Sequence, residues 1–166
     1  MNAVDRDHYV TFVVRGVEFG VALDRVGEVL PIGPWEAAPS APPCVVGVMH
    51  ARGAVMPVID LAAKLGETPG AVAALGSIGV VFVDVGGERR AFGLLAERIG
   101  QVVALGPEGI ARAPAFGAHR VACLLGIGLV DERLVMLLDV DRILLREELA
   151  QVSSLFTPAP EARGSG

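Results

Sequence analysis

The sequence has few cysteines, few aromatic residues and fewer basic than acidic side chains. Two cysteines among 166 residues do not make a disulfide framework in a chain this long. The 14 Lys and Arg residues are scattered and leave a net charge of −5. That balance argues against a nucleic-acid partner, because neutralising phosphates needs clustered basic side chains. With 52% hydrophobic and 20% charged residues, the chain is expected to fold as one packed unit or two intimate halves.

Long hydrophobic runs are lacking as well. The most apolar stretches, residues 70–83 and 121–130, stay below the roughly 18 uncharged residues that a membrane-spanning helix requires. The first residues, MNAVDRDHYV, carry charges where a secretory signal would have its apolar stretch. We therefore expect a soluble, cytoplasmic protein with no direct membrane insertion.

The motifs of common enzymes are also missing. The sequence contains no GxSxG, HExxH, P-loop or CxxC, and GIGLVD at 126–131 lacks the third glycine and the βαβ context of a dinucleotide site. We expect no catalytic activity, no cofactor and no metal. Cys44, His50, His119 and Cys123 are ligand types that suit tetrahedral zinc. Their spacings match no common zinc module, so a zinc-binding β-protein is kept only as a remote alternative.

A near-repeat is the most informative feature that the sequence does have. FGVALDRVGEVL at 19–30 returns as FGLLAERIGQVV at 92–103, with a constant offset of 73 residues and no gap. Downstream, a glycine and an aspartate 13 residues apart enclose an apolar run twice, once at 47–60 and once at 126–139. These echoes predict two copies of one small unit rather than a many-copy array.

Short β-branched runs punctuated by glycine predict a mainly β fold. Asp60 is a predicted N-cap for a short helix, LAAKL, that stops at Gly66, and a stronger helix is predicted at 140–152. Strands this short and repeated favour two small barrels, which leave few exposed sheet edges. The expected strands are Tyr9–Arg15, Glu18–Leu23, Val26–Ile32, Ala54–Ile59, Val80–Val85, Arg90–Ala96, Ile99–Leu105 and Leu134–Leu138.

The segment GVMHARGAVMPVIDL at 47–61, preceded by Pro42, resembles the signature of CheW-like chemotaxis adaptor (coupling) proteins. The stretch at 19–30 and LLGIGLVDERLVMLLDVDRIL at 124–144 resemble other parts of that family. The resemblance implies two SH3-like five-stranded β-barrels packed side by side, with a short helix after the first repeat and a C-terminal helix. It implies a single CheW-like domain at 9–150. Within that domain we expect a first barrel repeat at about 9–66, a linker at about 66–79 and a second barrel repeat at about 80–150, with end strands that can be exchanged between the barrels. The tail at 153–166 is expected to be disordered.

The same resemblance implies a non-catalytic scaffold of a bacterial chemosensory array. Such an adaptor would couple the cytoplasmic hairpin tip of chemoreceptors to the regulatory domain of a CheA-type histidine kinase. It would be cytoplasmic and recruited to receptor arrays at the inner face of the membrane. Two alternatives stay open: an adaptor of a variant chemosensory system, such as one for surface motility, and a ring-building module with little receptor contact.

Four candidate partner-binding residues lie in the signature segment. Gly53 allows a backbone turn, and Arg52 either presents a guanidinium fork to a partner or ties its own loop together. Gly47 is expected to serve backbone geometry first and an interface second. The family usually has Asn-Leu before Arg-Gly, where this chain has His50-Ala51. Partner specificity is therefore expected to differ at this loop.

Three further candidates, Val26, Glu28 and Trp35, lie upstream. Val26 and Val29 have opposite parity in a strand, so at least one of them is expected in the core. Glu28 is charged whereas its counterpart in the second copy, Gln101, is not, and a charge in one copy alone suits asymmetric partner choice. Trp35, the only tryptophan, either packs over the barrel or anchors a partner from its proline-rich loop.

Overall fold

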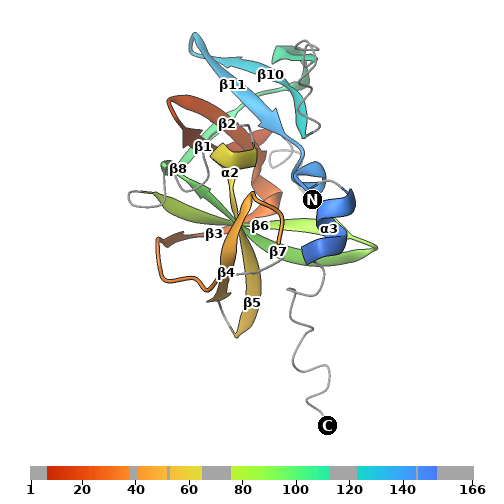
Figure 1. Ribbon diagram of the computed structural model, residues 1–166. Helices are drawn as coiled ribbons and strands as arrows, with labels where there is room; N and C mark the ends of the chain where they lie inside the picture. Colours follow the sequence, from red (N-terminus) through yellow and green to blue (C-terminus); the bar gives the residue numbers. More distant parts are fainter. Residues whose placement is uncertain are drawn as a thin grey trace.

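The fold is mainly β, as predicted, and consists of two sheets linked by short helical turns (Figure 1). Within the part of the chain that the structure describes, no helix is long and apolar enough to cross a membrane. The predicted tail at 153–166 and most of the predicted linker at 66–79 lie outside that part. The computed structural model describes residues 7–37, 41–51, 53–64, 76–112, 123–144 and 146–152.

The strands account for most of the described chain, and the helices are one or two turns long. In chain order the strands are β1 (His8–Val14), β2 (Val17–Ala22), β3 (Val26–Pro31), β4 (Val45–Ala51), β5 (Ala54–Asp60), β6 (Ser77–Val85), β7 (Glu88–Ala96), β8 (Arg98–Ala104), β9 (Ile110–Arg112), β10 (Leu124–Val130) and β11 (Arg133–Leu138). The helical elements are the 3₁₀ turns η1 (Leu23–Arg25), η2 (Pro107–Gly109) and η3 (Val140–Arg142), and the α-helices α2 (Leu61–Lys64) and α3 (Arg146–Val152).

Tight turns join the antiparallel neighbours, as the glycine punctuation predicts. β1 pairs with β2, and Phe12 lies opposite Phe19. Between these strands Arg15 and Gly16 have φ angles of 51° and 80°, the left-handed region that a two-residue hairpin turn requires. The Gly86-Gly87 turn between β6 and β7 has the same character, with φ angles of 58° and 85°. The predicted hairpins are therefore confirmed.

Each sheet combines strands from both copies of the repeat. One sheet has the order β8-β1-β2-β11-β10-β9 and the other the order β3-β6-β7-β5-β4. The copies meet where β2 runs parallel to β11, with Gly20 opposite Leu137, and where β7 runs parallel to β5, with Gly93 opposite Val58. A Cβ on Gly20 would lie 3.0 Å from Leu137 Cδ2, and one on Gly93 would lie 2.8 Å from Ile78 Cγ2. Gly20 thus allows a close approach between the copies, whereas Gly93 leaves room for Ile78 of the neighbouring strand β6.

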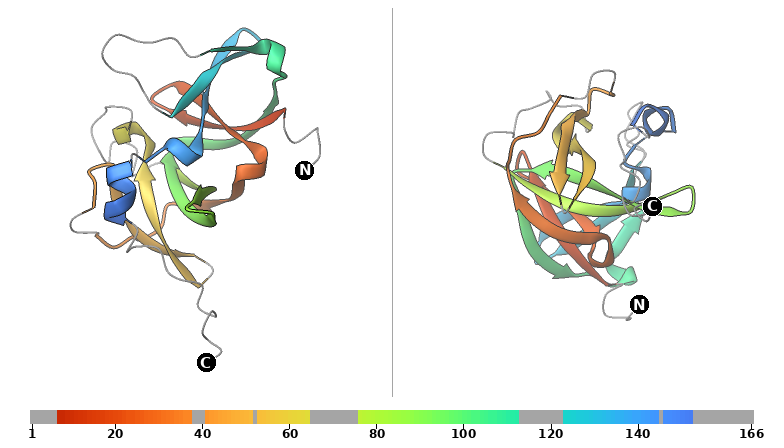
Figure 2. Two further views of the ribbon diagram at one scale, coloured as in Figure 1. Left: turned by 90° about the vertical axis from the view of Figure 1, so that its right-hand side faces the viewer. Right: turned by 90° about the horizontal axis from the view of Figure 1, so that it is seen from below.

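The largest hydrophobic core takes side chains from both sheets and from the C-terminal helical segment. The repeated phenylalanines, Phe19 and Phe92, are both buried in it, together with Ile143 and Val152. Burial of such side chains stabilises the folded state by about 1.5–3 kcal/mol each. Figure 2 shows the β10–β11 hairpin at one end of the molecule and the β4–β5 hairpin at the other. The shared core therefore joins two sheets whose outer hairpins point away from each other.

An aspartate starts each of the helical turns that follow β5 and β11. Asp60 Oδ1 accepts a hydrogen bond from the Ala62 N–H at 3.0 Å, so the predicted N-cap of α2 is confirmed. Asp139 Oδ1 accepts one from the Asp141 N–H at 3.1 Å and caps η3 in the same way. The recurring aspartates of the sequence are thus explained by capping.

The C-terminal helix differs from its prediction. The sequence pattern predicts one helix over 140–152, whereas the structure has η3 and, after a break, α3. Ile143 and Leu144, between the two, are buried in the main core, and Asp141 in η3 binds Arg25. These tertiary contacts hold the segment as two separate helical pieces. Hydrophobic periodicity along the sequence does not reveal such contacts.

Arg25, the last residue of η1, forms hydrogen bonds with both β6 and η3. Its Nη1 and Nη2 donate to the two carboxylate oxygens of Asp141 at 2.7 and 2.8 Å, and Nη1 also donates to the Phe82 carbonyl at 3.0 Å. The Asp84 N–H donates to Asp141 Oδ1 at 2.9 Å. These hydrogen bonds, that of Arg25 foremost, lower the pKa of Asp141 from its usual range. The bidentate geometry makes this the strongest polar link between the start and the end of the domain.

We expect Asp141→Asn to lower the free energy of unfolding by about 1–3 kcal/mol at pH 7, the usual size for hydrogen bonds to charged groups. Because the folded-state pKa of Asp141 is depressed, its stabilisation is present above the unfolded pKa of about 3.9. It is lost as the pH falls through the lower folded value. Denaturant unfolding at pH 7 and near pH 3 should therefore show the gap between wild type and variant shrinking in acid. Asp131→Asn, in an exposed turn, is the matched control, and a pH-independent gap would contradict this account.

Candidate partner-binding site

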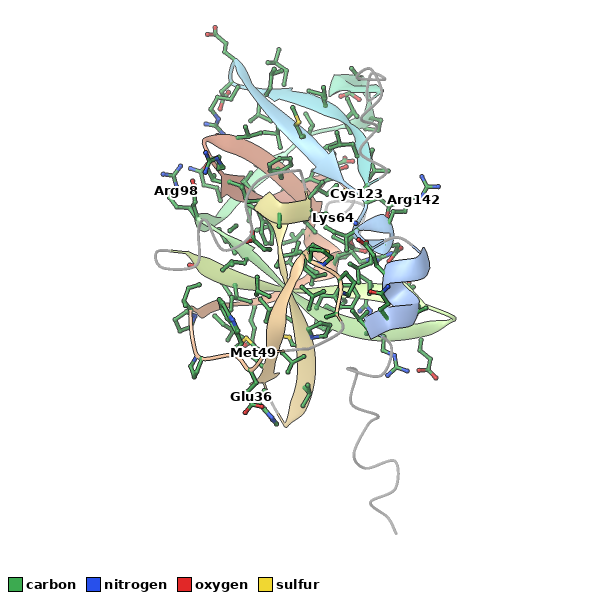
Figure 3. All side chains as sticks on the ribbon, viewed as in Figure 1. Glu36, Met49, Lys64, Arg98, Cys123 and Arg142 are labelled. Atoms are coloured by element: carbon green, nitrogen blue, oxygen red, sulfur yellow. The ribbon has the colours of Figure 1, made fainter. Side chains whose placement is uncertain are left out.

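A shallow groove of about 510 Å³ brings two of the predicted site residues together. Glu28 lines it from β3 and His50 lines it from β4, and these strands are the two edges of the five-stranded sheet. Leu30 and Met49 contribute apolar surface between them. Figure 3 labels Met49 near the outer end of the β4–β5 hairpin. The groove therefore combines an apolar lining with one acidic and one titratable side chain. Its lining residues are Glu28, Leu30, Pro31, Gly33, Met49, His50 and Ala51.

Alternation along β3 places the groove residues. Val26, Glu28 and Leu30 are half-buried, and the residues between them are exposed. Val26 packs against the main core, whereas Val29 is 46% exposed. This agrees with the prediction that at least one of the two valines is core. A shift in strand register between Val26 and Val29 marks a bulge, the kind of irregularity that re-aims side chains at a sheet edge.

Trp35 and Gly47 pack closely against each other. Trp35 is half-buried against the smaller core cluster around Met56 and Val58. The Glu36 N–H donates to the Val48 carbonyl at 2.8 Å, and the Val48 N–H donates back at 2.9 Å. A Cβ on Gly47 would lie 2.4 Å from the Glu36 carbonyl oxygen and 2.7 Å from Trp35 Cδ1. Gly47 is thus required for backbone approach, and the packing interpretation of Trp35 holds. A direct partner contact by either residue stays a prediction.

The turn between β4 and β5 contains Gly53, another of the predicted residues. Gly53 has a φ of 78°, the left-handed conformation expected of it, and no atom lies within 4 Å of the position its Cβ would take. The backbone turn that Gly53 was expected to allow is therefore present. Arg52 lies outside the described residues, so its role as a partner contact stays a prediction.

The two cysteines occupy equivalent places under the shared core. The Cys44 carbonyl accepts from the Asp60 N–H at 2.8 Å, and the Cys123 carbonyl accepts from the Asp139 N–H at 2.7 Å. Burial raises the pKa of the Cys44 thiol to about 11 and also raises the pKa of Cys123. Across the described ranges, no group of three or more His, Cys, Asp and Glu side chains could hold a metal ion. His119, from the zinc alternative, lies outside those ranges.

A second exposed surface was missed by the sequence reasoning. Three leucines of the β10–β11 hairpin, Leu125, Leu129 and Leu134, are 52–59% exposed, and Val17 at the start of the neighbouring β2 is 39% exposed. Leu129 lies directly opposite Leu134, so their side chains form a cross-strand pair. The run LLGIGLV is apolar at almost every position, which indicates burial of both faces. Only the structure reveals which face is open to solvent.

The family model described as a CheW-like domain matches residues 8–148. This chain belongs to the CheW-like family. It is 30% identical over 149 residues to a probable chemotaxis protein CheW of Rhizobium etli, covering 89% of this chain and 93% of that one. It is 26% identical over 148 residues to a chemotaxis protein CheW of Klebsiella aerogenes, covering 89% and 87%.

A solved structure supports the fold of this CheW-like domain. The crystal structure of scaffolding protein TtCheW from Thermoanaerobacter tengcongensis superimposes with a TM-score of 0.75 at 20% identity, covering 86% of this chain and 95% of that one. The resemblance inferred from the segments at 19–30, 47–61 and 124–144 is therefore confirmed. The family match spans both sheets, so the groove and the exposed leucines belong to one CheW-like domain.

We expect Gly47→Ala to destabilise the CheW-like domain by about 2–3 kcal/mol, because the new methyl group would press on backbone that cannot move aside. Gly126 has the same surroundings in the second copy, where a Cβ would lie 2.5 Å from the Ala111 carbonyl oxygen, and Gly126→Ala should cost as much. Gly53→Ala meets only left-handed backbone strain, about 1–2 kcal/mol. Thermal and denaturant unfolding would rank the three, and a Gly53→Ala cost equal to the other two would contradict the close-approach argument.

Both thiols should resist modification in the folded protein. The thiolate is the reactive form, and Cys44 and Cys123 are 5% and 1% exposed with raised pKa values. At pH 8 a disulfide reagent such as DTNB should titrate neither cysteine until denaturant is added, after which it should titrate both. Rapid labelling of the native protein at either position would show that the shared core opens easily.

Proposed function

We propose that this CheW-like chain is a non-catalytic adaptor in the cytoplasm. It couples chemoreceptors to a CheA-type histidine kinase and is recruited to receptor arrays at the inner face of the membrane. Membership of the family supports the adaptor role in general, and the relatives are named chemotaxis proteins. The observation that carries the proposal is the presence of two separate exposed surfaces at opposite ends of the β-domain. An adaptor must hold more than one neighbour at once.

The groove end suits a contact with the regulatory domain of the kinase. Glu28 and His50 stand on either side of apolar surface, and Gly53 lies in the turn that follows β4. Apolar contact supplies affinity, and a few charges set register and exclude wrong partners. Gln101 takes the place of Glu28 in the second copy, so only one end of the molecule offers this charge pattern.

The leucine end suits a second, more apolar contact. Solvent exposure of Leu125, Leu129, Leu134 and Val17 on adjacent strands is typical of protein interaction sites. Two unlike ends would let adaptor and kinase domains alternate in a ring, since each end selects a different face of its neighbour. A helical receptor hairpin would dock separately, laying an apolar helix face along exposed aliphatic side chains such as Val29.

Calorimetry with the regulatory domain of a CheA-type kinase from the same source tests this proposal. Wild type should bind two domains per adaptor. Glu28→Lys and Arg52→Ala should each weaken one site at least tenfold, about 1.4 kcal/mol, because they reverse or remove a contact charge. Leu129→Ser should abolish the other site and leave the first unchanged.

Circular dichroism would confirm that each variant folds, and Arg142→Ala, an exposed change in η3, is the matched control. Binding to receptor hairpins but not to the kinase domain would overturn the ring arrangement. Equal affinity for receptor-bearing and receptor-free kinase complexes would favour the ring-building alternative. Absence of binding to either partner would reject the adaptor proposal for this chain. Which chemosensory system it serves, flagellar or surface motility, would follow from the kinase that binds.

A further inference from the structure

The two copies of the repeat place an arginine at the same point of the fold. Arg25 precedes β3 and Arg98 begins β8, 73 residues later. Their strands have matching partners, since Val26 lies opposite Val81 in β6 and Ile99 lies opposite Phe12 in β1. The strand partners correspond, but Arg25 ends a 3₁₀ turn whereas Arg98 is the first residue of its strand, and the side chains nearby differ as well.

In the first copy the chain supplies the carboxylate. Arg25 takes both oxygens of Asp141 at 2.7 and 2.8 Å, and Asp84 stands at 3.4 Å. The arginine is three-quarters covered as a result, with a side-chain exposure of 22%. An arginine at this position of the repeat therefore binds a carboxylate when an acidic side chain lies within reach.

In the second copy the acidic partners are replaced. The capping aspartates Asp60 and Asp139 correspond to each other with an offset of 79 residues. By the same offset, Ala62 corresponds to Asp141, so the carboxylate that binds Arg25 has no counterpart for Arg98. Val81 and Phe12 hold corresponding positions in the two copies. Asp84 lies three residues after Val81, whereas the residue three positions after Phe12 is Arg15, so a basic side chain replaces Asp84. Arg98 is exposed, and among the described residues no acidic side chain contacts it. Within the part of the chain that the structure describes, the second copy thus keeps the guanidinium without a paired carboxylate.

Arg98 also borders a pocket of about 240 Å³ in the six-stranded sheet. Val13 lies opposite both Glu18 and Arg98, so these two charged side chains share a face two strands, or about 10 Å, apart. The buried Thr11 hydroxyl donates to the Gln101 carbonyl at 3.2 Å and fixes the floor. The pocket is lined by Thr11, Val13, Glu18, Arg98, Ile99, Gly100 and Gln101.

Glu18 forms the wall of the pocket opposite Arg98 and already makes an ion pair with another arginine. Its Oε2 pairs with Arg133 Nε at 3.1 Å, which offsets its charge. Its Oε1 is buried and has no hydrogen-bond partner within the described part of the chain. A ligand with a second negative charge near this wall would be repelled, whereas an N–H group beside the bound carboxylate would face an acceptor.

We propose that this pocket binds a carboxylate from outside the chain through the guanidinium of Arg98, in place of the internal carboxylate that Arg25 has. The fork of Arg98 accepts a carboxylate with two parallel hydrogen bonds. Glu18 favours a carboxylate with an amide nearby, as on a Glu or Asp side chain of a peptide. The pocket is separate from the groove at Glu28 and His50, so the inference stands whether or not the kinase binds there.

The test is an amide NMR titration of the whole chain with three probes: the peptide acetyl-Gly-Glu-Gly-amide, its Gln counterpart, and sodium acetate. The Glu peptide should shift the amides of Thr11, Gly100 and Gln101, and the Gln peptide should not. Arg98→Ala should weaken the Glu peptide at least tenfold, and Arg98→Lys should fall between because it keeps the charge without the fork. Arg142→Ala, another exposed arginine (Figure 3), should leave binding unchanged.

The probes also separate the two sources of the carboxylate. Tighter binding of the Glu peptide than of acetate would identify an acidic protein segment, and equal binding would identify a small free carboxylate. Both results support the pocket. An unshifted spectrum with every probe at millimolar concentration would overturn it, as would an Arg98→Ala variant that binds as well as wild type. Because Arg98 is exposed, loss of binding in that variant would not come from unfolding, and circular dichroism would verify this.

Discussion

Four pairings between strands of opposite copies hold this CheW-like domain together. β2 runs parallel to β11 and β7 runs parallel to β5, while β1 pairs antiparallel with β8 and β3 with β6, so each sheet combines strands of both copies. Parallel neighbours need long connections, which makes the contacts between the copies distant in sequence. Neither copy can form its sheet alone, and the shared core around Phe19 and Phe92 follows from that exchange. This constraint explains why glycine is required at position 20, where a Cβ would lie 3.0 Å from Leu137 of the other copy.

The same arrangement lets equivalent positions acquire different roles. Gly47 and Gly126 meet the same backbone obstacle, and Asp60 and Asp139 cap the same kind of turn, so the frame is symmetric. The surface is not symmetric, because Arg25 is closed by Asp141 whereas Arg98 stays exposed. A protein that must join unlike neighbours benefits from two similar halves with different ends.

Much of the fold could be predicted from the sequence because the repeat carried it. Phe-Gly, the glycine–aspartate spacing and the hairpin turns are local signals, and most of the strands, the turns and the Asp60 cap followed from them. The strands β4, β9 and β10 were not among those expected. The interrupted C-terminal helix could not be predicted, since Arg25 lies more than a hundred residues from Asp141. The exposure of Leu129 and Leu134 was hidden for a different reason: an apolar strand does not reveal which of its faces is covered. At the groove, Glu28 and His50 lie on the two edge strands of one sheet, and only the tertiary structure shows that they line the same surface.

Hydrogen–deuterium exchange of this chain, with and without the regulatory domain of a CheA-type kinase, tests the central claim most directly. The claim is that one β-domain presents two unlike ends to its neighbours. The account predicts new protection in β3 and β4 around the groove and in the β10–β11 hairpin, with the shared core unchanged because it is already protected. Protection at one end alone, or none at either end in the presence of excess kinase domain, would contradict it.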